Sequence, residues 1–203
     1  QSTTEGGWDT HGFNNTRMFP IVEKYHLPIT EQTLPTLLND GRVIFSRWDY
    51  IDKALWRIQS LWTTRQDGTQ VETFWGNQSV WPDHLAEARP IPGSDRVMFT
   101  GVAHHDWFAG SIGILDPSRG RNFPHGLTKV TADVAWPECG PPPQDPIEAA
   151  DYHAAGKFDA YQTPYPISEE DFLVSARREG KFRLYLMDVH GNRELIYEGA
   201  HHV

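Results

Sequence analysis

The residues with the clearest capacity for chemistry are His104, His105 and Asp106, which stand in a row within a segment flanked by glycines. Imidazole nitrogens and carboxylate oxygens bind zinc and iron, so this group suggests a metal or catalytic site. Successive side chains of a strand point to opposite faces, so both histidines reach one metal only from a loop. The alternative is that they are loop histidines packed against neighbouring aromatic side chains. No cofactor is predicted, and a metal ion remains the open alternative.

A second polar group, Trp48-Asp49-Tyr50 with Asp52, follows a β-like run and could line a pocket at a strand end. Its other interpretation is structural, with Trp48 in the core and the Asp49 carboxylate accepting hydrogen bonds from backbone N–H groups of the loop. Cys139 is the one cysteine of the chain, and it could act as a nucleophile only beside a histidine. It stands in a proline-rich segment that shows no such pattern.

Composition excludes several classes of protein. The 203 residues carry a formal net charge of -9, and no basic stripe typical of a nucleic-acid binder is visible. A single cysteine excludes an internal disulfide and also the Cys-x-x-Cys-His motif that attaches c-type haem. No apolar run approaches the roughly 20 residues that span a bilayer. The sequence has no Gly-x-Ser-x-Gly elbow, no phosphate-binding glycine loop and no His-Glu-x-x-His motif.

The elements that would position these residues are short strands separated by tight turns. Aromatic residues make up 12% of the chain and glycine and proline are frequent, which favours strands and turns over long helices. A pattern of turn, buried strand, apolar strand ending near Asp, glycine turn and final strand occurs three times, with Val43, Val97 and Phe172 at corresponding positions. The aspartates that end the apolar strands are predicted to organise the hairpin turns; they are Asp67, Asp116 and Asp188.

This repeat predicts an all-β fold, a partial β-propeller of about three to four antiparallel blades. Residues 1–34 would form an N-terminal arm or incomplete blade, and residues 35–203 the blades, with a proline-rich insert at 136–158 that cannot join a sheet ladder. Because so few blades leave the ring open, the missing blades lie outside this chain or the ring closes by oligomerisation. We favour the first of these.

The order of the motifs resembles the middle-domain family of the hydrazine synthase alpha subunit. The resemblance rests on the segments 38–52, 61–69, 88–94 and 184–197, and the last is shared with the wider group of TolB and WD40-like propellers. It implies a propeller domain inside a larger exported, periplasmic bacterial protein, although no signal peptide is visible in this sequence. The haem chemistry of the anammox enzyme is not implied, because the haem attachment motif is missing.

Two functions follow from the sequence. The first is a non-catalytic scaffold or interaction module, whose partners are other domains of the same larger protein or a second protein, with no nucleic acid and no membrane span. Aromatic residues expected at its surface would make the contacts; they are Trp75, Trp81 and Trp107. The alternative is a metal-dependent enzyme, hydrolytic or redox, with His104, His105 and Asp106 on one face of the propeller.

Overall fold

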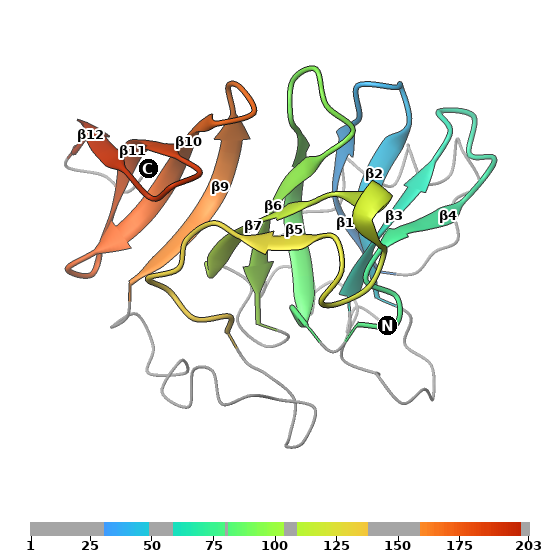
Figure 1. The fold of residues 1–203 in the computed structure, drawn as a ribbon, viewed down its shortest axis with the longest axis horizontal. Coiled ribbons are helices and arrows are strands. Elements are labelled where there is room, and N and C mark those ends of the chain that lie inside the picture. Colours follow the sequence, from blue (N-terminus) through green and yellow to red (C-terminus); the bar gives the residue numbers. More distant parts are fainter. Residues whose placement is uncertain (1–30, 49–58, 80, 104–108, 138–158, 200–203) are drawn as a thin grey trace, which may run out of the picture.

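The computed structural model describes residues 31–48, 59–79, 81–103, 109–137 and 159–199 (Figure 1). Within these ranges the chain forms twelve β-strands and one 3-10 turn of helix, η2 at Pro117–Arg119. The strands make two open sheets, one of eight strands and one of four. The prediction of an all-β fold is therefore confirmed. No helix in the described ranges is long and apolar enough to cross a membrane.

The strands fall into three successive antiparallel meanders of four strands each. In each meander every strand pairs with the next one along the chain. The first meander contains β1 (Glu31–Leu37), β2 (Val43–Trp48), β3 (Gln59–Thr64) and β4 (Glu72–Trp75). The second contains β5 (His84–Pro90), β6 (Val97–Val102), β7 (Ser111–Leu115) and β8 (Leu127–Lys129). The third contains β9 (Ala160–Pro166), β10 (Asp171–Arg178), β11 (Lys181–Asp188) and β12 (Arg193–Tyr197).

Neighbouring meanders are joined by very few backbone contacts. The eight-stranded sheet is two meanders held together by one parallel pair, Gln59 opposite His84. The third meander is a separate sheet, and an isolated bridge links it to the second, with both N–O distances between Gly110 and Tyr161 at 2.8 Å. Since backbone pairing is so sparse here, side-chain packing must hold the meanders together.

The register confirms the repeat expected from the sequence. Val43 and Val97 begin the second strand of their meanders and Phe172 is the second residue of β10; each lies opposite the last residue of the first strand. All three first strands also carry a bulge with one residue in the left-handed region, at Leu34 (φ 57), Glu87 (φ 52) and Thr163 (φ 55). Since a bulge leaves a residue outside the ladder, it lets proline follow the bulged residue in two of these strands.

Two apolar clusters fill the spaces between the meanders. The first lies between meanders one and two and includes Ile44, Leu61, Val97 and Phe99; the second lies between meanders two and three. Along β6 the side chains alternate, so that Val97 and Phe99 enter the first cluster while Met98 enters the second. The middle meander is therefore buried on both faces, whereas every residue of β12 is exposed.

A close approach at Gly113 of β7 gives a test of this packing. A Cβ atom added there would lie 2.6 Å from Phe99 Cε1 and 3.0 Å from Trp136, whose rings stack with centroids 5.9 Å apart. We expect Gly113→Ala to lower the free energy of unfolding by about 1 to 3 kcal/mol, because the stacked rings must separate. Urea unfolding measures the loss, and Thr128→Ala on the exposed side of β8 is the control. A Gly113→Ala protein as stable as the control would contradict the packing.

Candidate functional site

Most of the candidate site residues lie outside the described ranges. This applies to the metal candidates His104, His105 and Asp106, to the other polar group at Asp49, Tyr50 and Asp52, and to Cys139 and Trp107. Of the second polar group only Trp48 is described, and it is half-buried at the end of β2. Within the described ranges no group of three His, Cys, Asp or Glu side chains could hold a metal ion.

Two buried ionisable residues that no sequence pattern indicated, Asp83 and His84, stand at the start of β5. Both side chains are 0% exposed. The Asp83 carbonyl accepts a hydrogen bond from the Gln59 backbone N–H at 2.8 Å, and His84 lies opposite Val102 of β6. Both residues lie near the two candidate segments of the sequence. Gln59 pairs with Trp48, which precedes Asp49, and Val102 stands two residues before His104. Isolated in the sequence, Asp83 and His84 match no motif.

The three aspartates predicted to organise turns do so. Asp67 accepts hydrogen bonds from the backbone and hydroxyl of Thr69, at 2.9 and 2.7 Å. Asp116 accepts equivalent bonds from Ser118, and Asp188 accepts from the backbone and amide of Asn192. These hydrogen bonds lower the pKa of all three carboxyl groups. Their task is to shape the hairpins.

The prediction of exposed tryptophans at Trp75 and Trp81 is wrong. Trp75 is 0% exposed and Trp81 5% exposed, and both belong to the cluster between the first two meanders. The Trp75 indole N–H donates to the His125 carbonyl at 3.0 Å, and Trp81 packs edge-on against Phe123 with ring centroids 5.3 Å apart. The large aromatic residues that the structure exposes are instead Tyr165 and Tyr197, both in the third meander.

A cleft of about 350 Å³ opens where the turns of the first two meanders meet. Its apolar wall includes Leu38 and Phe74, and three arginines reach its rim. Arg42 is paired with Asp40 at 2.7 Å and with Glu72 at 2.8 Å, and Arg96 with Glu169 at 2.6 Å. The third, Arg121, donates to the Thr73 carbonyl at 3.2 Å. Arg121 has no carboxylate partner within the described ranges. Its guanidinium is therefore the group on this rim that could bind a small anion.

Polar side chains also tie each turn to the next meander. The Asn39 amide in the turn between β1 and β2 donates to the carbonyls of Ile91 and Ser94 at 2.7 and 3.0 Å. Arg96, at the end of the following turn, pairs with Glu169 in the turn between β9 and β10. The same kind of link therefore occurs at both junctions, although the residues differ.

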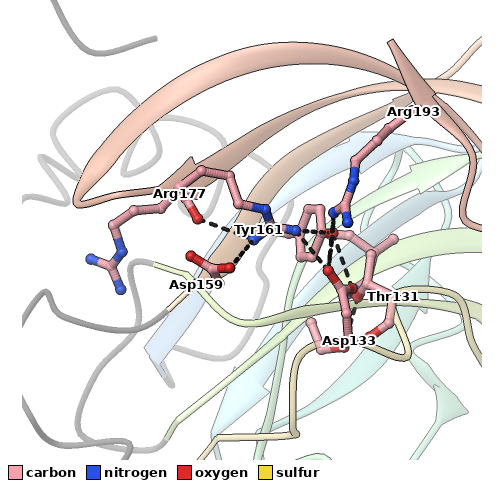
Figure 2. Close-up of polar contacts among 9 residues, drawn as sticks. Thr131, Asp133, Asp159, Tyr161, Arg177 and Arg193 are labelled. Atoms are coloured by element: carbon pink, nitrogen blue, oxygen red, sulfur yellow. Dashed lines mark hydrogen bonds and ion pairs between the residues drawn. The ribbon is translucent and has the colours of Figure 1, made fainter. Parts of the chain in front are cut away.

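A polar cluster, which we call the clasp, joins the second meander to the third and contains Asp133, Tyr161, Arg178 and Arg193. Figure 2 labels Asp133, Tyr161 and Arg193 of this cluster. Asp133 lies in the segment after β8, and the other three come from β9, β10 and β12. The Tyr161 hydroxyl donates to the Asp133 carboxylate, 3.0 and 2.9 Å from its two oxygens, and accepts from Arg178 and, at 2.7 Å, from Arg193. Both arginines also pair with Asp133, at 2.8 and 3.0 Å.

The electrostatics of the clasp keep its carboxylate charged. Burial acts to raise the pKa of Asp133, but hydrogen bonds from Arg193 and Tyr161 and the charge of Arg178 outweigh it, so the pKa is lowered. Burial, together with the hydrogen bond to Asp133, raises the pKa of the Tyr161 hydroxyl, which stays protonated and can donate. The Arg178 guanidinium also lies 4.6 Å from the centroid of the Tyr161 ring. These contacts suit a structural joint between meanders.

Comparison with known proteins adds one similarity of fold. No family model matches the chain, and no curated protein matches it. A solved structure of Kuenenia stuttgartiensis hydrazine synthase is similar, with a TM-score of 0.62 and 16% sequence identity over 83% of this chain. The match covers 20% of that protein's chain, so the sequence spans about a fifth of its length. At this identity the similarity concerns the fold alone.

The clasp predicts how stability depends on pH. The pKa of Asp133 is lower in the folded state than its value of about 3.9 in the unfolded chain. Its contribution to stability is therefore complete above that unfolded value and is lost as the pH falls through the lower folded pKa. We expect Asp133→Asn to be clearly destabilised at pH 7 and to approach the wild type at the lowest pH at which both fold.

Urea unfolding at a series of pH values measures this difference. Asp95→Asn is the matched control, because the Asp95 carboxylate has no hydrogen-bond or ion-pair partner among the described residues. A difference between wild type and Asp133→Asn that stays constant with pH would show that the charge of Asp133 does not stabilise the fold.

Proposed function

We propose that this chain is a partial β-propeller of about three to four blades that serves as a scaffold or interaction module within a larger exported bacterial protein. One observation carries the proposal: three equivalent four-stranded meanders follow one another and pack face to face in the same order. A propeller is built from such four-stranded sheets around a central axis, and each sheet buries its faces against its neighbours.

The arrangement of the first strands supports the same proposal. β5 packs against β1, and β9 packs against β5, so the first strand of each meander lies beside that of the one before. Glu87 at the bulge of β5 accepts from the backbone N–H of Thr163 at the bulge of β9, at 2.6 Å. Corresponding strands of propeller blades surround the axis in this way.

The role in a larger protein is supported by the likeness to about a fifth of a longer chain. Its partners would be other domains of the same protein or a separate protein. Export is part of the proposal because the family resemblance of the sequence implies a periplasmic protein. In this function the clasp and the turn links keep the meanders in register, and binding occurs at turns and open sheet faces.

A substitution at the second junction tests whether the meanders form one packed series. Met98 is 1% exposed in the cluster between meanders two and three. We expect Met98→Ala to lower the free energy of unfolding by about 2 to 5 kcal/mol because it leaves a cavity. Leu195→Ala, at a site 45% exposed, should change it by less than about 0.5 kcal/mol. Equal effects in urea unfolding would mean that the junction contributes no packing.

Elemental analysis separates the scaffold from a metal-dependent enzyme. We expect folded wild-type protein and the His104→Ala, His105→Ala double variant to contain the same trace amounts of zinc and iron. Stoichiometric metal in the wild type that disappears in the double variant would contradict the scaffold and favour the enzyme, since a catalytic site needs about three protein ligands.

A further inference from the structure

The outer face of the third meander, on the side away from the second, carries a partly open group of apolar residues, with Ser175 and Glu194 on the same face. Residues directly opposite each other on paired strands share a face, and Tyr165, Leu173 and Leu186 form one such row across β9, β10 and β11. Leu184 and Tyr197 form a second pair on β11 and β12. The three leucines are half-buried, and Tyr165 and Tyr197 are 61% and 49% exposed.

The repeat shows what happens to this face in the other meanders. The residue that follows the first strand is Leu38 in the first meander, Ile91 in the second and Ile167 in the third. Leu38 is 7% exposed, in the cluster between meanders one and two, and Ile91 is 0% exposed, in the cluster between meanders two and three. Ile167, with no described meander beyond it, is 50% exposed.

Three further positions behave in the same way. Ile44 and Met98 are buried against the following meander, and the register gives Leu173 the same position in the third. Leu61 and Ile112, both 0% exposed, correspond to Leu184. The last set is Thr63, Ile114 and Leu186. The covered face of the second meander thus carries a buried apolar residue at every position where the third leaves one partly open, and the first meander does so except at Thr63.

We propose that the outer face of the third meander is the docking surface for a further four-stranded meander of the same repeat, contributed by polypeptide outside this sequence. The inference rests on the proposed function and identifies the surface and the partner through which the scaffold acts. The incoming meander places its first strand beside β9. It presents apolar side chains where the third meander presents Phe172, Val174 and Met187 to the second.

A second copy of this chain matches the face less well than a further meander of the repeat. Its first meander would have to offer the face that corresponds to Phe99 of the second meander and Val174 of the third, which is the face of Phe45. Phe45 is already 2% exposed, and Thr64, on the same face, is 1% exposed. The half-buried residues left on that face of β2 and β3 are Val43, Arg47 and Trp62, and the Arg47 guanidinium lies 4.4 Å from the Trp62 ring centroid. The face therefore offers a cation and few apolar groups to Leu173, Leu184 and Leu186 of another copy.

The test adds a further meander to the end of the chain and measures whether it covers the outer face of the third meander. The 203-residue chain is extended after Val203 with a second copy of residues 138–199, with Cys139→Ser throughout and Ile167→Cys in the first copy alone. We expect maleimide to label this cysteine about tenfold more slowly than in the unextended protein, because the added meander covers it. Leu37→Cys, at a site 55% exposed in the first meander, is the control and should label equally in both.

The second variant places a charge on the outer face of the third meander. Leu184→Glu in the first copy should restore fast labelling of the extended protein, whereas Leu195→Glu should not, because Leu195 lies opposite Tyr185 on the other face. Labelling that is equally fast with and without the extension overturns the proposal. Dimerisation of the unextended chain also overturns the proposal if Leu184→Glu abolishes it, because the face would then bind a second copy of the chain. If the propeller proposal itself is wrong, Met98→Ala fails to destabilise the unextended chain.

Discussion

The structure depends on removing both faces of a thin antiparallel meander from water, which a single meander cannot do alone. One face of the first meander and one face of the third close against the second, so the second packs against a neighbouring meander on both sides. The backbone contributes little to this, because one parallel pair and one isolated bridge are the ladder contacts between described meanders. Apolar packing and a few polar links therefore set the arrangement, as in other repeat proteins.

The clasp and the turn links explain how sheets that share so few backbone bonds stay in register. Packing between two apolar faces is not directional, so it tolerates sliding. Hydrogen bonds and ion pairs demand geometry, and the clasp fixes three strands of the third meander to one carboxylate of the second (Figure 2). Glu87 adds a fixed point between the first strands. These polar groups hold the relative position of surfaces whose stability comes from burial.

Sequence patterns located the second and third strands of each meander, because those strands are rich in apolar and β-branched residues and end at glycine turns. The first strands were not identified, because bulges and prolines such as Pro35 and Pro164 interrupt their alternation. Burial of Trp75 and Trp81 was missed because a strand pattern does not reveal which face meets a neighbour. The clasp could not be predicted, since Asp133 and Arg193 are 60 positions apart and become neighbours only through the stacking.

Native-state hydrogen exchange of the unmodified chain tests the central claim most directly, by comparing β7 with β11. Each is the third strand of its meander and pairs with a strand on both sides, but β7 is buried throughout whereas β11 is mostly half-buried. Stacking with an open outer face predicts that the amides of β11 exchange clearly faster than those of β7. Equal protection of the two strands would contradict it, because the outer face of the third meander would then be closed already.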